Sequence, residues 1–523
     1  MKPARLYVKL ACVALLTILA FTSCGRDRDT AHEPAEALQQ SLTLQDLLDT
    51  AYTRRQGIYP PDTEQLTQLT YGRPPNTISL VDAFYRRPQT TKRLSTSDVI
   101  HDIQLFFDML REVYGAYTYF GGDEVFLPIF EEILEELATR EYWFPDTFLP
   151  VVYNGLAPYI TDNHLSIGHH FHREYTFTSD YDVFASPSFF DRTDNGFRDR
   201  SNGLYVREVV GHDADDIFRL TVNQYGEFLY TPVIEGHNNH EGCNCLVIIY
   251  ENGESATLQF NVARNERRPA YREPSLEVID GFPVVTINRM YFEHFNPESI
   301  EGANTFMSEE ASTFMSFINR LQDEPAFIID LRGNVGGNGM LARRWLYNLT
   351  GEVIPINSVE LVAESYDFYS SFRIPGPGDP SYQPMCEVTA QRVSLPFGDN
   401  HVLRVDRNAD MAKQMVSHDQ IIIFLTSRYT ASAAEDFIDM AFNMENTLII
   451  GQNTYGVLLT NLCFPWRFLP RTGVEFSLGS TILIHADAHN WREGVGFAPD
   501  LWVPHNEDAL LAALALLRNH FGD

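Results

Sequence analysis

The stretch Tyr429-Thr-Ala-Ser-Ala-Ala-Glu435 follows the apolar run Ile421–Thr426 and opens a helical pattern over residues 433–444. This order predicts that Ser432 lies on a turn between a strand and a helix, where acyl transfer can use an exposed serine. A helix N-terminus favours developing negative charge, so the N–H group of Ala433 is a candidate oxyanion donor. The same residues also fit a plain helix cap, and on this stretch alone both readings stay open.

A second motif, Asp330-Leu-Arg-Gly-Asn-Val-Gly-Gly337, lies upstream and also follows an apolar run. Glycine lets a backbone approach a substrate closely, so Gly336 or Gly337 is a candidate second donor to an oxyanion. A simple turn is the alternative reading of these glycines. In this order, the serine turn and the glycine loop together favour acyl-transfer chemistry.

Strand and helix patterns alternate from Leu276 onward, which predicts a largely parallel sheet covered by helices. Asn506 is the predicted cap of a last helix that ends near Leu517. The predicted strands are 282–288, 326–331, 421–426 and 447–450, and the other predicted helices are 303–321, 340–349 and 433–444.

Two regions precede this α/β part. Apolar residues recur at helical spacing between residues 42 and 160, with a cap at Ser95 to Asp98, and predict a helical domain. Short alternating runs between residues 175 and 268 predict a β-rich module, with a hairpin turn at residues 251–254. The predicted divisions are a helical domain at 42–172, a β-rich module at 173–270 for which a PDZ-like fold is left open, and an α/β domain at 271–523.

Composition limits the partners of this chain of 523 residues. Asp and Glu number 70 against 39 Lys and Arg, and the net charge of -31 argues against binding to nucleic acid or anionic lipid. The sequence sets no oligomeric state.

The first residues are typical of an export signal. Lys2, Arg5 and Lys9 precede an apolar segment at residues 10–21 that is too short to span a bilayer, and Cys24 follows small residues. This pattern resembles a bacterial lipoprotein signal, with an ordinary cleavable signal as the alternative. We expect a signal peptide at 1–23, a lipidated Cys24, a polar tether at 24–41, and a bacterial cell-envelope location, periplasmic or on the cell surface, with no membrane span.

The serine and glycine motifs, together with Gly451-Gln-Asn-Thr-Tyr-Gly456 and Glu493-Gly-Val-Gly-Phe-Ala-Pro-Asp500, resemble the serine peptidase family of C-terminal processing (tail-specific) proteases and tricorn protease. The resemblance covers most of residues 275–504. It implies a ClpP/crotonase-like α/β catalytic domain, Ser432 as nucleophile, a peptide or protein substrate, and neither a cofactor nor a metal.

The resemblance leaves two choices for the base that activates Ser432. The processing-protease branch uses a lysine just after the Gly-x-x-Thr-x-Gly stretch, where this chain has Val457. Beyond the predicted signal peptide the only lysines are Lys92 and Lys413, and neither has an apolar sequence context that would lower its pKa enough for a base. A serine–lysine dyad is therefore not expected.

The tricorn-like branch uses a histidine from an Asp-x-His element, which Asp162-Asn-His164 resembles. Imidazole titrates near neutrality and can take the serine proton and return it to the leaving amine. In that branch a glutamate supports the histidine through a serine, and the matching positions hold Glu493 and Asn163. We expect His164 to be the base, Glu493 and the Asn163 amide to support it, and Asp162 to position the loop.

Other clusters carry less specific signals. His237-Asn-Asn-His240-Glu-Gly-Cys243-Asn-Cys245 has metal-ligand residue types, but Cys-x-Cys is not the usual zinc spacing. Histidines also gather at 168–172. If the exported chain contains a disulfide, Cys386 with Cys463 is the expected pair, because Cys243 and Cys245 are too close in sequence to bridge without strain.

Two alternative functions can be compared with the sequence. A catalytically inactive peptide- or ligand-binding protein on the same fold would explain Val457 and Asn163 as decay, but Ser432, His164 and the glycine loop are all retained. An α/β-hydrolase esterase would require Gly-x-Ser-x-Gly around the serine, which this chain lacks.

Overall fold

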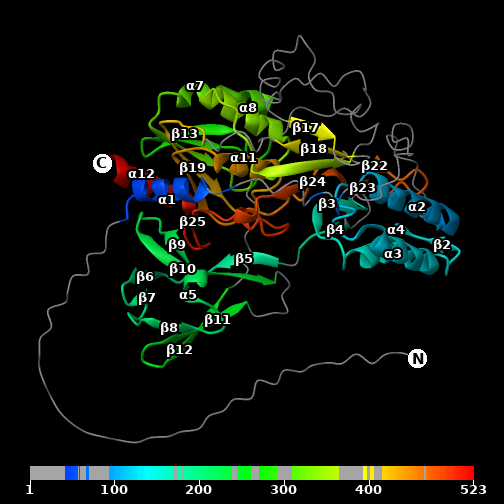
Figure 1. The fold of residues 1–523 in the computed structure, drawn as a ribbon, viewed down its shortest axis with the longest axis horizontal. Helices are drawn as coiled ribbons and strands as arrows, with labels where there is room; N and C mark the ends of the chain where they lie inside the picture. Colours follow the sequence, from blue (N-terminus) through cyan, green and yellow to red (C-terminus); the bar gives the residue numbers. More distant parts are fainter. Residues whose placement is uncertain are drawn as a thin grey trace, which may run out of the picture. The chain divides into compact units, whose positions relative to one another are not determined.

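A large mixed sheet, in which a run of parallel strands carries the serine and glycine motifs, organises the fold (Figure 1). The order is β13 (Ser275–Ile279), β14 (Phe282–Thr286), β15 (Ala326–Asp330), β19 (Ile421–Thr426), β20 (Thr447–Gly451), β25 (Leu501–Trp502), β9 (Phe218–Val222), β10 (Phe228–His237), β6 (Phe190–Thr193) and β7 (Gly196–Asp199), and β5 (Tyr181–Ala185) pairs with β10. The five strands from β14 to β25 pair in parallel, and β25 also pairs in parallel with β9, whereas the remaining pairs are antiparallel.

The computed structural model describes residues 42–56, 58, 66, 68–69, 93–168, 175–179, 181–237, 244–260, 270–290, 309–363, 393–396, 401–405, 415–463 and 467–522. Several predicted features lie outside these residues: the signal peptide 1–23, Cys24 and the 24–41 tether, Lys92, Lys413, Cys386, residues 169–172, and residues 238–243 of the histidine-cysteine stretch. Within the described ranges, no helix is long and apolar enough to cross a membrane.

The central strands are mostly apolar because helices cover both faces of the sheet. Every residue of β15, β19 and β20 is buried. Successive side chains of β19 alternate between two cores: Ile422 and Phe424 face one, and Ile423 and Leu425 face the other. The first core includes α8 (Gly339–Thr350) and α11 (Ala433–Ala441), and the second includes α1 (Leu44–Arg55) and α12 (Ala509–Phe521). The predicted α/β alternation is therefore confirmed.

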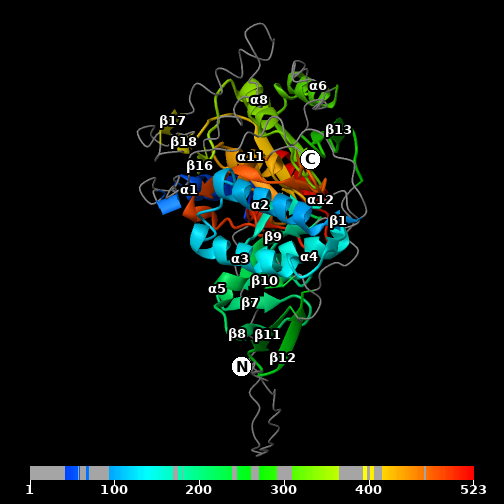
Figure 2. The same cartoon turned by 90° about the vertical axis from the view of Figure 1, so that its right-hand side faces the viewer.

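Three helices, α2 (Thr96–Glu112), α3 (Gly122–Leu137) and α4 (Pro145–Leu156), pack together as the helical periodicity predicts (Figure 2). The Ser95 side chain caps α2 by accepting the N–H of Asp98. The helices share a core with a four-stranded sheet of order β22 (Arg467–Phe468), β23 (Glu475–Ser477), β3 (Asp162–Ile167) and β4 (Tyr175–Phe177). Strand β3, which carries His164, is thereby paired to a strand from the C-terminal part of the chain.

The β-rich region contains a separate sheet of order β12 (Ser255–Gln259), β11 (Cys245–Tyr250) and β8 (Val206–Val209), beside the short helix α5 (Ala214–Ile217). The predicted hairpin turn is confirmed, since the Tyr250 N–H donates to the Glu254 carbonyl at 2.8 Å. A five-stranded sheet has the order β17 (Val393–Pro396), β18 (His401–Val405), β16 (Ser358–Ala363), β24 (Gly479–His485) and β21 (Thr460–Cys463).

Some predicted boundaries differ from the observed ones. Asn506 does not cap α12, because the Glu507 N–H donates to the Pro504 carbonyl and places Asn506 inside a turn; Asp508 caps instead. Helix α11 ends at Ala441 rather than at Met444. In the predicted 303–321 helix, the described residues form α6 (Glu309–Ser316) and α7 (Ile318–Leu321).

Candidate active site

Ser432 occupies a strained turn between β19 and α11. Its φ of 54° and ψ of -124° form a backbone conformation that residues other than glycine rarely adopt. No hydrogen bond from α11 caps the helix through the Ser432 hydroxyl. Instead the hydroxyl oxygen lies 3.2 Å from Nε2 of His164. The side chain is therefore placed for proton transfer rather than for capping.

Hydrogen bonds from the glycine loop and from Tyr455 hold the residues that precede Ser432. The Ala431 N–H donates to the Asn334 carbonyl at 2.9 Å, and the Thr430 hydroxyl donates to the Leu331 carbonyl at 2.9 Å. The Tyr455 N–H donates to the Thr430 carbonyl at 2.8 Å. Three bonds to two other segments thus fix the residues just before Ser432.

His164 reaches Ser432 from strand β3, 268 residues earlier in the chain. Its backbone N–H donates to Oδ1 of the fully buried Asp162 at 2.9 Å. Oδ2 of Asp162 accepts the hydroxyl groups of Tyr114 and Thr460, at 2.6 and 2.9 Å. Asp162 therefore holds the backbone of the strand rather than the imidazole.

Burial lowers the pKa of the His164 imidazole, because the charged ring would lose its hydration. The negative charge of Asp162 and the backbone of Thr460 act in the opposite direction and raise this pKa. Nδ1 of the ring is buried and has no hydrogen-bond partner of normal geometry within the described ranges. The ring is thus favoured in its neutral form, which can accept the serine proton.

The Glu493 side chain supports strand β3, which carries His164, by accepting a backbone N–H of that strand. Oε1 of Glu493 accepts the Asn163 N–H at 2.8 Å, and Oε2 accepts the Leu459 N–H at 2.9 Å. The Asn163 side chain donates to the Gly456 carbonyl at 3.3 Å instead of contacting the imidazole by a hydrogen bond. The contact that we predicted through the Asn163 amide is therefore made by its main chain. Burial, followed by the charge of Asp162, raises the pKa of the Glu493 carboxyl well above its usual range.

The candidate oxyanion donors differ in availability. The Gly336 N–H donates to Oδ1 of Asn334 at 2.9 Å, so it is already used. Among the described residues, neither the Gly337 N–H nor the Ala433 N–H has an acceptor. Gly336 still requires the absence of a side chain, because a Cβ there would lie 2.6 Å from the Ala431 carbonyl oxygen and 2.7 Å from the Ala433 nitrogen. A Cβ on Gly337 would also lie only 2.0 Å from the Met290 carbonyl oxygen, so both glycines are closely packed and Gly337 is the one whose N–H is a donor candidate.

Residues 302–503 match the family described as peptidase family S41. These residues belong to peptidase family S41. The predicted fold class, a ClpP/crotonase-like α/β domain with added helical and β-rich parts, is confirmed, and the S41 region carries a serine peptidase fold. No curated protein matches the chain by sequence.

Similar solved structures include mature CPAF (14% identity, TM-score 0.43, covering 82% of this chain and 99% of that one). The photosystem II D1 C-terminal processing protease is 12% identical with a TM-score of 0.33, covering 77% of this chain and 93% of its own. Tricorn protease is 12% identical with a TM-score of 0.34, covering 82% of this chain and 37% of its own. These similarities are too weak to carry a functional inference.

Glu435 is a buried residue of the S41 region that our sequence reasoning did not single out. Its carboxylate accepts the N–H of Ser432 at 3.0 Å, of Gly456 at 3.0 Å and of Val457 at 2.7 Å, and the Thr454 hydroxyl at 2.6 Å. Burial raises the pKa of this carboxyl, and the four hydrogen bonds oppose that rise. The spacing Ser432-x-x-Glu435, a capping-box pattern, was the available sequence signal.

Position 457, where the processing-protease branch has its lysine, holds a buried valine whose N–H binds Glu435. The part of the chain that the structure describes contains no lysine, so no lysine base is placed near Ser432 there. The same residues contain no group of three or more histidine, cysteine, aspartate or glutamate side chains arranged to hold a metal ion.

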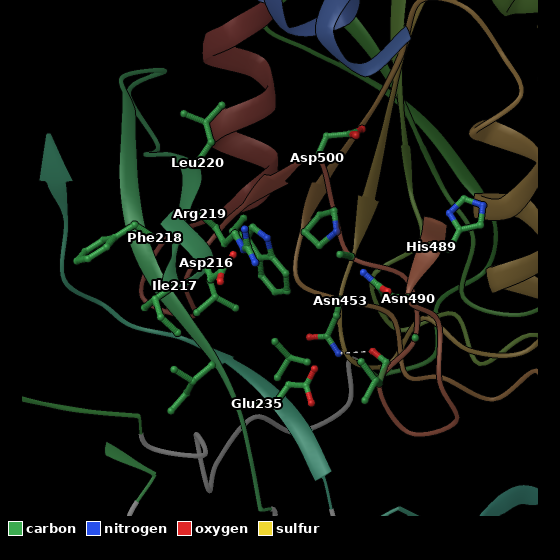
Figure 3. A pocket seen from close by; sticks show the side chains of 18 of the residues that line it. Asp216, Ile217, Phe218, Arg219, Leu220, Glu235, Asn453, His489, Asn490 and Asp500 are labelled. Carbon is green, nitrogen blue, oxygen red and sulfur yellow. Dashed lines mark hydrogen bonds between the residues drawn. The ribbon is translucent and has the colours of Figure 1, made fainter. Parts of the chain in front are cut away.

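A cavity of about 1020 Å³ lies between residues of the S41 region and residues of α1 and the β-rich region (Figure 3). Strands β9 and β10 form one wall, and the segment from His489 to Trp502 forms the other. Neither Ser432 nor His164 lines it. Its size is typical of a ligand site, but the candidate pair Ser432 and His164 lies outside it.

Proposed function

We propose that this chain is a serine peptidase in which Ser432 is the nucleophile and His164 is the general base, as in the tricorn-like branch. The observation that carries the proposal is the 3.2 Å separation of the Ser432 hydroxyl oxygen and Nε2 of His164. Supporting it are the lowered pKa of His164 and the absence of lysine from the described residues.

The reaction would follow acyl transfer. The Ser432 oxygen attacks the peptide carbonyl while His164 takes the hydroxyl proton. The carbonyl oxygen becomes an oxyanion, which the Ala433 and Gly337 N–H groups would bind. His164 then returns the proton to the leaving amine as the C–N bond breaks. Water, deprotonated by the same imidazole, releases the acyl group from Ser432.

Three carboxylates would act by position rather than by direct chemistry. Asp162 and Glu493 hold the backbone on either side of Asn163, and Glu435 holds the Ser432 N–H. The negative charge of Asp162 also stabilises the imidazolium that forms during the reaction.

A fluorophosphonate probe tests the proposal directly. The folded protein should react with the probe, and mass spectrometry of the peptides should place the adduct on Ser432. Absence of labelling in folded protein would favour the alternative, a catalytically inactive peptide- or ligand-binding protein. An adduct on another serine would reject Ser432 as the nucleophile.

The pH dependence of kcat/KM provides a test of His164. The base must be neutral, and burial lowers its pKa from the ordinary 6.5. The neutral form therefore persists to lower pH, so kcat/KM for a fluorogenic peptide should rise with pH along a limb centred below 6.5. A rising limb centred well above that value would contradict a buried, neutral histidine base.

We also propose that the protein is exported and anchored in a bacterial cell envelope by a lipid on Cys24. The basic and apolar pattern before this cysteine supports the proposal. When the full chain is expressed in a bacterium with an alkyne-labelled fatty acid, the label should be incorporated. The Cys24→Ala variant should lose it, and undiminished labelling of that variant would reject the anchor.

A further inference from the structure

Strands β5 and β10 carry two acidic residues that contact the loops of the candidate active site. Asp182 on β5 pairs with Arg428, with Oδ2 and Nη2 separated by 2.8 Å. Glu235 on β10 pairs with Arg492. In the antiparallel register Asp182 lies opposite Gly236 and Val183 lies opposite Glu235, so the two acids occupy adjacent positions of the strand pair.

Each arginine belongs to a segment of the proposed catalytic machinery. Arg428 lies in the turn that leads from β19 to Ser432, and Arg492 directly precedes Glu493. A further close approach joins the same regions, because a Cβ on Gly494 would meet the Ser179 Cβ at 2.1 Å. The β-rich region therefore touches both the nucleophile turn and the segment that supports the histidine strand.

The two ion pairs differ in burial. The side chains of Arg428 and Asp182 are 23% and 8% exposed. Those of Arg492 and Glu235 are 58% and 48% exposed, and Glu235 is one of the residues that line the cavity (Figure 3). An exposed pair contributes little, whereas removing one partner of a buried pair leaves a charge without compensation. Loss of one partner should therefore cost more free energy in the Arg428–Asp182 pair than in the Arg492–Glu235 pair.

The surroundings of Tyr455 link this pair to the positioning carboxylates Glu493 and Glu435. Burial raises the pKa of the Tyr455 hydroxyl, Arg428 lowers it, and Asp182, Glu493 and Glu435 raise it. All four charged groups therefore act on one side chain. The backbone N–H of the same tyrosine binds the turn at Thr430.

We infer that the Arg428–Asp182 ion pair is a positioning contact, by which strand β5 holds the turn before Ser432 in its reactive geometry. The inference rests on the proposed function of Ser432. A strained backbone conformation persists only where its surroundings over-determine it, and the φ of 54° at Ser432 is such a conformation. Small displacements of a nucleophile cause large losses in rate. The β-rich region thereby contributes to the acylation step without touching substrate.

The test compares Asp182→Asn, Arg428→Gln and the double variant with Glu235→Gln as the matched control. We would measure kcat and KM on a fluorogenic peptide, the second-order rate of fluorophosphonate labelling, and the unfolding midpoint. Each single variant should lower kcat and the labelling rate about 10- to 100-fold, with KM unchanged within about 2-fold. The double variant should be no slower than the slower single variant. Glu235→Gln should stay within about 2-fold of the wild type.

Several results would overturn the inference. They are rates for Asp182→Asn equal to those of Glu235→Gln, losses that multiply in the double variant, or a change confined to KM. If Asp182→Asn fails to fold, Arg428→Lys replaces it: retention of the charge should keep a rate well above that of Arg428→Gln, and equal rates would reject the ion pair. Unlabelled wild-type protein would instead reject the proposed function itself.

Discussion

Ser432→Ala and His164→Ala are each expected to lower kcat for peptide hydrolysis by about 10⁴-fold or more, because the two groups act as one unit in acylation. In the proposed mechanism the Ser432 oxygen forms the bond to carbon, and Nε2 of His164, which lies 3.2 Å away, receives its proton. Removal of either group stops the same step. The double variant should therefore be about as slow as each single variant, when kcat is measured with a fluorogenic peptide under single-turnover conditions.

His505→Ala is a suitable control, since His505 is exposed and lies outside the candidate site. Its kcat should equal that of the wild type. A small effect of His164→Ala, in a protein that Ser432→Ala inactivates, would show that another group is the base. Equal activity in all variants would trace the hydrolysis to a contaminating peptidase.

Glu435→Leu is expected to lower both activity and stability. The variant leaves the buried N–H groups of Gly456 and Val457, the partly buried N–H of Ser432 and the Thr454 hydroxyl without the carboxylate that accepts them. Each unsatisfied buried group costs about 1–3 kcal/mol, so the free energy of unfolding should fall by roughly 3 kcal/mol or more. Because the Ser432 N–H is one of these groups, kcat should fall about 100-fold in molecules that remain folded.

Denaturant unfolding and active-site titration separate the two effects. Glu435→Gln keeps one acceptor oxygen and should lie between the wild type and Glu435→Leu in both measurements. Glu352→Gln removes an exposed carboxylate and serves as the control. A Glu435→Leu protein with wild-type stability would contradict the buried hydrogen-bond network, and full kcat at reduced stability would limit Glu435 to a structural role.

Local patterns in the chain predicted the parts of the fold whose interactions are close in sequence. The apolar run of β19 and the helical period after Ser432 predicted a strand–turn–helix, and the Ser95 cap of α2 is confirmed. The predicted cap of α12 at Asn506 was wrong. Asn506 and Asp508 are both suitable cap residues, and the turn from Pro504 to Glu507 selects Asp508. Which residue caps the helix therefore depends on the path of the chain before it.

Hydrogen-bond partners were harder to predict, because several acceptors compete for each donor. The Gly336 N–H is taken by Asn334, and the link from Glu493 passes through the Asn163 main chain. The hydrogen bonds of Glu435 could not be predicted, because three of its partners follow β20, at residues 454–457. Only the tertiary structure shows that this one carboxylate binds both the Ser432 N–H and the 454–457 segment.

By itself the sequence determined the α/β core, the serine turn with its glycine loop, and the absence of a lysine after the Gly451–Gly456 stretch. These features follow from periodicity, glycine positions and residue identity, which are local properties. The sequence resemblance named His164 as the base, but only the tertiary structure gives the 3.2 Å separation between its Nε2 and the Ser432 hydroxyl oxygen, and only the tertiary structure pairs Asp182 of β5 with Arg428. The pairing of β3 with β23 and of β5 with β10 sets those contacts. The register of two strands that are distant in sequence cannot be predicted from either strand alone.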